Sequence, residues 1–227
     1  MPLGQVHQDL NLREMERVFQ DRKEAGRELA EALMSYSASN AVVFAIPSGG
    51  LPVAAEVSRL LGLKLEVLVV RKLQLPQDPE AGFGAVGPEG IIVLNEYLIS
   101  VNRLSHFIIE EQAAKARRSL RFREELFRDN APYPDMKDRT AIIVDDELAS
   151  GFTMLAAVQF MRKKGAKRIV VAVPTGSERA VEMVSESADE VYCLNIRSTP
   201  LFSVAAAYQN WYDISEEEAL AILKARV

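Results

Sequence analysis

The chain has 227 residues, of which 48% are hydrophobic and 26% charged, and its net charge is −5; this length and apolar content fit one α/β domain with a sizeable core, or at most two small domains. A single cysteine, Cys193, and two histidines exclude a disulfide framework, a cysteine-rich metal site and a multi-histidine zinc site. The acidic balance argues against nucleic-acid binding, no apolar run reaches the roughly 20 residues of a membrane span, and the N-terminus has no export signal, so we expect a cytoplasmic protein.

The first elements are expected to be a helix, a buried strand and a second helix. Apolar side chains recur at roughly helical spacing over residues 10–35. Residues 42–46 are all apolar and end in Pro47-Ser48-Gly49-Gly50, which predicts a buried parallel strand followed by a loop. A helix over residues 51–61 then ends at Gly62, because glycine readily takes the left-handed backbone that closes a helix.

The middle of the chain is less regular. Residues 65–70 predict a second strand, with Arg71-Lys72 at its end. The stretch 73–90 is rich in proline and glycine and is expected to be a mobile excursion before a β run over 91–94. Residues 101–129 predict a long charged helix with a break, in which basic side chains are interleaved with glutamates. We expect this helix to present a solvated, internally paired face, with a phosphate-facing or partner-facing role as the alternative.

Three further strands are expected in the second half of the chain, over residues 138–144, 168–173 and 191–194. Helices are expected between them, and a last helix begins with a capping box at Ser215. Strands that alternate with helices predict a single α/β domain over residues 1–227, with a doubly wound, mostly parallel sheet of about five strands.

Four loops follow predicted strands, at residues 47–50, 71–90, 145–153 and 174–177. In doubly wound sheets ligands bind outside the carboxyl ends of the strands, where the strand order reverses. All four loops lie on that edge whatever the strand order is, so we expect the functional site there.

The residues from 141 to 153 carry the strongest functional signal. An apolar run leads into Asp145 and Asp146, and a turn of small and hydroxyl residues follows at the start of a helix. The acidic pair can accept hydrogen bonds from vicinal hydroxyls, while free backbone N–H groups and the positive end of the helix dipole suit a phosphate. The segment therefore predicts a sugar-phosphate site, and the alternative is a plain strand–turn–helix with surface aspartates.

This segment resembles the sugar-phosphate signature of type I phosphoribosyltransferases, which has a hydrophobic strand, two acids, a short spacer, Thr-Gly and then Thr or Ser. Ser150 stands in place of the first Thr and keeps a hydroxyl. Residues 19–29, 45–56 and 189–193 resemble an uncharacterised branch of the same family, so the similarity covers most of residues 19–212. The resemblance implies the type I phosphoribosyltransferase fold with a small hood over the site.

The resemblance implies 5-phosphoribosyl 1-pyrophosphate as the donor, bound with Mg²⁺. Asp145 and Asp146 would bind the ribose 2′- and 3′-hydroxyls, directly or through the metal and its waters. The 5′-phosphate would lie on the amides and hydroxyls of the turn. The substrate-binding residues implied in this segment are Glu147, Leu148, Ala149, Ser150, Gly151, Phe152 and Thr153.

Two further loops are implied to bind the pyrophosphate. Ser48, Gly49 and Gly50 form the first, although the uncharacterised branch carries Arg where Ser48 stands. Arg71 and Lys72 would neutralise the leaving group, and the segment after them would close as a lid that excludes water. The alternatives are a simple strand–helix turn and a solvated Arg-Lys pair ahead of a surface loop.

The implied reaction is attack of a nucleobase nitrogen on C1 as pyrophosphate leaves, with the acids stabilising the developing positive charge. A purine-like base used in salvage is expected, and an adenine-type enzyme is slightly favoured because Ala149 stands where 6-oxopurine transferases have a carboxylate. Glu80 is the candidate proton carrier, and it joins Arg71, Lys72 and the acidic pair as the catalytic residues.

The hood is assigned to the N-terminal helix and residues 195–227. The aromatic side chains there would cover the base, or alternatively anchor the last helix: Phe202, Tyr208, Trp211 and Tyr212. Asp21 and Arg22 are expected to be an exposed charge pair. A homodimer is expected because the family often pairs subunits near the active site. Two other functions stay open, namely a non-catalytic regulator that binds phosphoribosyl pyrophosphate or a nucleotide, and a sugar-phosphate hydrolase or phosphorylase.

Overall fold

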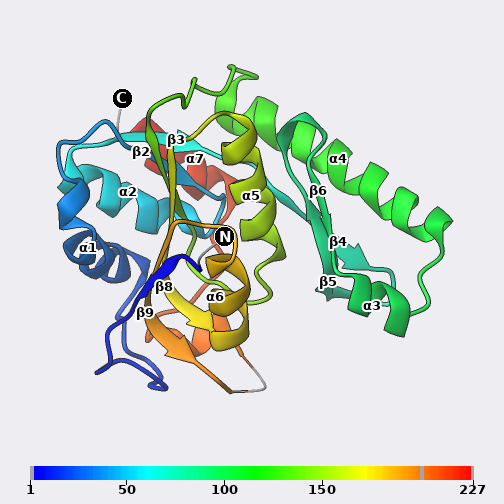
Figure 1. Ribbon diagram of the computed structural model, residues 1–227, viewed down its shortest axis with the longest axis horizontal. Coiled ribbons are helices and arrows are strands. Elements are labelled where there is room, and N and C mark those ends of the chain that lie inside the picture. The colour runs from blue at the N-terminus through cyan, green and yellow to red at the C-terminus, as the bar shows by residue number, and fades with distance from the viewer. Residues whose placement is uncertain (1–2, 200–201, 226–227) are drawn as a thin grey trace.

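The centre of the structure is a parallel sheet. The computed structural model describes residues 3–199 and 202–225, with only the backbone of residues 79 and 80, and within these ranges the sheet has six strands in the order β1-β9-β8-β7-β2-β3 (Figure 1). Every neighbouring pair in it is parallel, as predicted. The strands are β1 (Gln5–His7), β2 (Val42–Ala45), β3 (Lys64–Val67), β7 (Thr140–Val144), β8 (Arg168–Ser177) and β9 (Glu190–Arg197).

Helices cover both faces of this sheet. The helices α1 (Arg22–Ala32), α2 (Gly50–Leu61) and α7 (Glu216–Lys224) lie on one face, and α5 (Phe152–Lys163) and α6 (Glu178–Ser185) lie on the other (Figure 1). Successive strand residues point to opposite faces, so Val43 packs with the first set of helices and Phe44 with the second. The apolar runs of the sequence are continuous because both faces of the sheet are buried.

A second, antiparallel sheet projects beside the first. Its strands, in the order β4-β5-β6, are β4 (Arg71–Leu75), β5 (Asp78–Val86) and β6 (Ile92–Leu94). They lie with α3 (Glu96–Val101) and the long α4 (His106–Arg128) in the unit at the right of Figure 1. Short 3-10 turns complete the chain: η1 (Met34–Tyr36), η2 (Pro88–Gly90) and η3 (Val204–Ala207).

The expected mobile excursion over residues 73–90 is therefore wrong. Leu73 and Phe83 are fully buried, so these strands contribute to the core. Gly84, with φ of 156°, lies so close to β6 that a Cβ there would come within 2.2 Å of the carbonyl oxygen of Val93. The glycines thus serve close strand approach as well as turns. Arg71 and Lys72 begin β4, whereas the strand before them ends at Val67.

The helix expected over residues 10–35 is wrong in its first half. α1 begins at Arg22, after the side chain of Asp21 accepts hydrogen bonds from the N–H groups of Lys23 and Glu24. The preceding residues run as a loop, with Glu14 and Arg17 in the left-handed backbone region at φ of 60° and 53°. A helix cannot include such residues.

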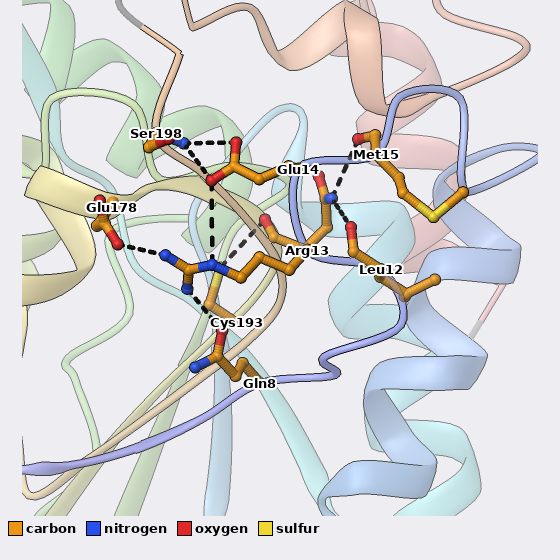
Figure 2. A network of polar contacts seen from close by, with 9 residues as sticks. Gln8, Leu12, Arg13, Glu14, Met15, Glu178, Cys193 and Ser198 are labelled. Carbon is orange, nitrogen blue, oxygen red and sulfur yellow. Dashed lines mark hydrogen bonds and ion pairs between the residues drawn. The ribbon is translucent and has the colours of Figure 1, made fainter.

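Side-chain contacts fasten this N-terminal loop to the carboxyl ends of β8 and β9. Figure 2 shows Arg13 donating to Gln8 at 2.9 Å and pairing with Glu178, while the carboxylate of Glu14 accepts from the N–H of Ser198 at 3.0 and 3.1 Å. Asn195 in β9 donates to the carbonyl oxygen of Met15 at 3.2 Å. The loop is thus held by partners far away in the sequence.

The boundaries of other helices and strands differ from the prediction in some places and agree with it in others. β8 continues to Ser177, so the loop predicted at residues 174–177 is a strand, and β1 at Gln5–His7 was not predicted. The broken helix expected over residues 101–129 begins later than predicted, because α3 ends at Val101 and α4 runs from His106 to Arg128. Gly62, at φ of 64°, ends α2, and the hydroxyl of Ser215 caps α7, as predicted.

Three of the six Lys and Arg side chains of α4 form ion pairs with acidic partners among the described residues. Arg117 pairs with Glu110 on the same helix at 3.7 Å, and both side chains are about half exposed. Arg123 and the nearly buried Arg128 instead leave the helix to pair with Glu216 and Glu66 at 2.9 Å. The expected solvated face therefore holds for the first part of the helix, while its end is tied to the rest of the fold. Among the described residues, no helix combines the length and apolar character needed to cross a membrane.

Replacing Arg128 by Ala is expected to destabilise the protein by about 3 kcal/mol, because a buried ion pair loses one partner and buried carbonyls lose their donor. Arg128 donates to Glu66 and to the carbonyl oxygen of Val67 at 2.9 and 2.8 Å. Urea denaturation measures the change. Arg117→Ala on the same helix is the control and should stay within about 0.5 kcal/mol of the wild type; equal losses in the two variants would contradict the assignment.

Candidate functional site

The acidic pair lies at the carboxyl edge of the parallel sheet, in the middle of the strand order. β7 ends at Val144, and Asp145 and Asp146 follow it. Because Ala45 of β2 is paired with Val144, the loops after these two strands begin side by side. This is the edge at which ligands are expected in doubly wound sheets.

The loop at residues 47–50 packs directly against the acids. A Cβ on Gly49 would lie 2.3 Å from Oδ2 of Asp146, and a Cβ on Gly50 would lie 2.8 Å from the Cα of Asp145. Only glycine permits this approach. The peptide bond between Pro47 and Ser48 is cis. The predicted pyrophosphate loop is thus placed in contact with the predicted ribose site.

The turn between β7 and α5 is fastened to β8 at its beginning. The N–H of Leu148 donates to the carbonyl oxygen of Thr175, and the hydroxyl of Ser177 donates to that of Ala149 at 2.7 Å. Gly151, at φ of 81°, caps α5. Among the described residues, none accepts a hydrogen bond from the N–H groups of Ala149, Ser150 or Gly151. Such donors at a helix N-terminus suit an anion, and residues 148–153 are named the anion-binding turn for this expected role.

The turn and the second sheet enclose one cavity of about 310 Å³. One wall comes from the segment after β7 and the other from the second sheet and α3. The lining residues are Lys72, Ala81, Gly82, Leu98, Asp145, Glu147, Leu148, Ala149, Ser150, Gly151, Thr153 and Met154. The structure therefore brings eight of the predicted site residues together around a single space.

Other predicted site residues lie elsewhere. Gly49 and Gly50 pack against the acidic pair, and Ser48 and Phe152 also lie outside the cavity lining. Arg71 also lies outside this lining; burial, and next the nearby charge of Arg123, lowers its pKa. The side chain of Glu80 falls outside the described residues.

The two acids face different surroundings. Asp145 lines the cavity, and its Oδ1 accepts from the N–H of Asp146 at 2.9 Å. Asp146 is buried, and its Oδ2 accepts from Nε of Arg22 at 2.8 Å. Arg22 is therefore a buried partner of the site, and the expectation of an exposed charge pair at residues 21 and 22 is wrong.

The C-terminal aromatics pack around Arg22. Its guanidinium carbon lies 3.8 Å from the ring centre of Trp211, and its Nη1 donates to the carbonyl oxygen of Tyr212 at 2.8 Å. The hydroxyl of Tyr208 donates to the carbonyl oxygen of Asp146 at 2.9 Å. The sequence signals for this contact were the Asp-Arg pair at a helix start and the downstream aromatic cluster, but nothing in the sequence connects them.

Carboxyl groups crowd the inner end of the cavity. Burial, and next the charge of Asp146, raises the pKa of Asp145 well above its usual range. The same two causes raise the pKa of Glu147 to about 7, although Lys72, Arg22 and Arg197 oppose the shift. A cation near these groups would favour their ionised forms.

These residues fit Mg²⁺ in the way that metal usually binds. In the described part of the chain, no three His, Cys, Asp or Glu side chains gather into a metal cage. Mg²⁺ typically takes one or two carboxylates and keeps its other positions for water and substrate phosphates. The cavity offers the carboxylate of Asp145 next to an anion-binding turn, which matches that donor set.

Comparison with known proteins shows the family to which the chain is related. A family model described as "Phosphoribosyl transferase domain" matches residues 16–211. A protein named "Putative phosphoribosyl transferase" in two strains of Mycobacterium tuberculosis is 40% identical over 209 residues, which cover 91% of this chain and 46% of the relative. The chain thus spans about half the length of these curated relatives.

A solved structure and a shorter match complete the comparison. The crystal structure of TT1426 from Thermus thermophilus has 39% sequence identity and a TM-score of 0.72, and the match covers 90% of this chain and 97% of that one. A stretch of 73 residues is 38% identical to ribose-phosphate pyrophosphokinase of Thermococcus kodakarensis, covering 31% of this chain and 26% of that protein. With the family model matched over most of its length and with the predicted parallel fold in place, the chain belongs to the type I phosphoribosyl transferase domain family.

Proposed function

We propose that the protein is a Mg²⁺-dependent phosphoribosyltransferase, which moves the 5-phosphoribosyl group from phosphoribosyl pyrophosphate to a nucleobase and releases pyrophosphate. One observation carries the proposal: Asp145 and the anion-binding turn lie in the wall of the same cavity of about 310 Å³. A ligand that joins hydroxyls to a phosphate can reach both at once.

The turn is proposed to hold the 5′-phosphate. Ser150 and Thr153 line the cavity beside the N–H groups that have no acceptor among the described residues. Hydrogen bonds from amides and hydroxyls to an oxyanion are charge-assisted and therefore stronger than neutral ones. The acidic pair after β7 is proposed to bind the ribose hydroxyls, directly or through Mg²⁺ and its waters.

The pyrophosphate is proposed to lie between the loop at residues 47–50 and the second sheet. Lys72 faces the cavity from β4 and supplies a positive charge there, with Arg71 as the neighbouring cation. Bound Mg²⁺ would supply further neutralisation of the leaving phosphates. The second sheet then takes the role proposed for a lid, because Ala81 and Gly82 close the cavity on that side and keep water from the activated sugar.

In the proposed reaction, the bond between C1 of the ribose and the pyrophosphate oxygen breaks, and a bond from C1 to a base nitrogen forms. Positive charge develops on the ribose ring, and the carboxylates beside it stabilise that charge. The proton released by the base needs an acceptor, for which Glu80 is the candidate.

The acceptor is proposed to be a purine-like base, with adenine slightly favoured. Ala149, in the cavity wall, stands where 6-oxopurine enzymes have a carboxylate. The N-terminal loop and the segment after β9 are the proposed hood over the base. They are joined by the N–H of Arg17, which donates to the carbonyl oxygen of Ala206.

A screen of nucleobases with phosphoribosyl pyrophosphate tests the proposal, and adenine should cause release of pyrophosphate. Release of pyrophosphate without any base would indicate a hydrolase. Tight binding of phosphoribosyl pyrophosphate without release would indicate a regulator.

Replacing both Asp145 and Asp146 by Asn should abolish Mg²⁺-dependent binding of phosphoribosyl pyrophosphate, because neutral amides hold neither the metal nor the hydroxyls as strongly. We expect a loss of roughly 100-fold or more, measured by calorimetry. Circular dichroism should show an intact fold, since the amide oxygen of an asparagine at position 146 can still accept from Arg22. Asp138→Asn, at the exposed opposite edge of the sheet, is the control. Unchanged affinity in the double variant would refute the site.

Replacing Thr153 by Val should weaken binding of ribose 5-phosphate roughly tenfold, because one hydrogen bond from a hydroxyl to the charged phosphate contributes about 1.5 kcal/mol. Thr153 lies in the first turn of α5 and lines the cavity. Thr140→Val, at the other end of β7, is the matched control and should bind normally. If the two variants bound equally well, the phosphate would not lie on this turn.

A further inference from the structure

The side chain of Arg22 is held in one place by three kinds of contact. Its Nε donates to Oδ2 of Asp146 at 2.8 Å, and its Nη1 donates to the carbonyl oxygen of Tyr212 at 2.8 Å. The face of its guanidinium lies 3.8 Å from the ring centre of Trp211. Arg22 is only 5% exposed, so these contacts replace most of its hydration. A planar guanidinium suits this combination of a carboxylate partner and an aromatic ring.

The position of Arg22 is itself fixed by the start of α1. Asp21 caps the helix, so Arg22 is its first residue and extends toward the carboxyl edge of the sheet. The next turn of α1 packs closely on α2, where a Cβ on Gly26 would lie 2.7 Å from the carbonyl oxygen of Val53. This contact sets the position of α1 on α2, and so the position from which the side chain of Arg22 extends.

Asp146 has three close neighbours within the protein. Arg22 occupies its Oδ2, the hydroxyl of Tyr208 donates to its backbone carbonyl at 2.9 Å, and Gly49 leaves no space beside its carboxylate. Asp146 does not belong to the cavity lining. Its negative charge is balanced within the protein before any ligand binds.

Asp145 has the opposite surroundings. It lines the cavity, and the N–H of Asp146 donates to its Oδ1 at 2.9 Å. The placement of Asp146 therefore sets the direction of that N–H, and through it the orientation of the Asp145 carboxylate. A chain of contacts runs from Arg22 through Asp146 to Asp145.

We propose that the acidic pair has divided roles, in which Arg22, stacked on Trp211, fixes Asp146 as a positioning carboxylate, and Asp145 alone contacts the ribose hydroxyls or their metal. The inference rests on the proposed function for the identity of the ligand. It changes the assignment of Asp146, which contacts no ligand. Arg22 is a positioning residue that acts on Asp145 through Asp146.

Trp211 provides a direct reporter of this arrangement. It is the only tryptophan in the chain. Its ring lies against the guanidinium of Arg22, which also donates to Asp146. Indole emission responds to a neighbouring charge. Loss or displacement of the Arg22 contact should therefore shift the emission of Trp211, whereas a change confined to the cavity should leave it nearly unchanged.

The test compares Asp145→Asn, Asp146→Asn, Arg22→Met and the double variant Arg22→Met/Asp146→Asn, with Arg27→Met on the exposed side of α1 as the control. Three quantities are measured in the full chain: Trp211 emission, melting temperature, and affinity for phosphoribosyl pyrophosphate with Mg²⁺ by calorimetry. Arg22→Lys is added because it keeps the charge and loses the planar stack, so it should rescue part of each change.

Asp145→Asn should lose roughly 100-fold in affinity with little change in emission or melting temperature. Arg22→Met and Asp146→Asn should each lower the melting temperature by roughly 10 °C, because each leaves a buried charge without its partner. The double variant should regain most of that temperature, since no buried charge remains. It should also bind at least about tenfold more tightly than Asp145→Asn, because the N–H to Asp145 is kept.

The results separate this inference from the proposed function. If the double variant binds as weakly as Asp145→Asn, Asp146 contacts the ligand and the division of roles is wrong. If the effects of Arg22→Met and Asp146→Asn on melting temperature and Trp211 emission simply add, the two residues are not coupled and the inference also fails. If the wild type does not bind phosphoribosyl pyrophosphate, the proposed function fails. If the effects of Arg22→Met and Asp146→Asn on melting temperature and emission are nevertheless non-additive, the coupling between Arg22 and Asp146 is still supported.

Discussion

The ion pair between Arg22 and Asp146 is the interaction on which the site depends. A carboxylate at the end of a buried strand costs several kcal/mol unless a partner compensates it. Here the partner comes from the first residue of α1, and the nitrogen–oxygen distance is 2.8 Å. Segments distant in sequence meet at this point. The rings of Trp211 and Tyr208 lie near the guanidinium of Arg22, and the hydroxyl of Tyr208 donates to the carbonyl oxygen of Asp146. The N-terminal helix, the central strand and the C-terminal aromatics therefore meet at Asp146, whose N–H donates to the carboxylate of Asp145.

The cavity lies between two parts of the fold. The anion-binding turn is anchored to β8 by Leu148 and Ser177 and begins a helix packed on the central sheet. The opposite wall, with Lys72 and Gly82, belongs to the antiparallel sheet that projects with α4. In the proposed function, the 5′-phosphate would lie on the turn next to the central sheet, while the pyrophosphate would meet the antiparallel sheet. This arrangement suits a reaction in which one end of the donor stays bound while the other leaves.

The sequence predicted the parts of the fold that are determined locally. Uninterrupted apolar runs identified β2 and β7, and Gly62 and Ser215 marked helix ends, because these signals depend on neighbouring residues alone. The acidic pair and the turn were likewise predicted from one contiguous segment. The N-terminal loop was missed because distant partners such as Asn195 hold it. The second sheet was missed because glycines that permit strand contact look like turn glycines. Arg22 was misjudged because its aromatic partners lie about 190 positions downstream.

The charges around the cavity indicate what the ligand itself has to bring. Burial, and next the charge of Asp146, raises the pKa of both Asp145 and Glu147, and Lys72 in the opposite wall opposes the shift at Glu147. A simple dianion would be repelled at this end although the turn attracts it at the other. A sugar with neutral hydroxyls toward the acids and its phosphate toward the turn avoids that repulsion. A second phosphate group on the same sugar does not avoid it, so a donor with pyrophosphate at C1 would bind together with a cation rather than alone. The need for Mg²⁺ would then follow from the crowding of carboxyl groups, which is the same crowding that makes Arg22 necessary on the other side of Asp146.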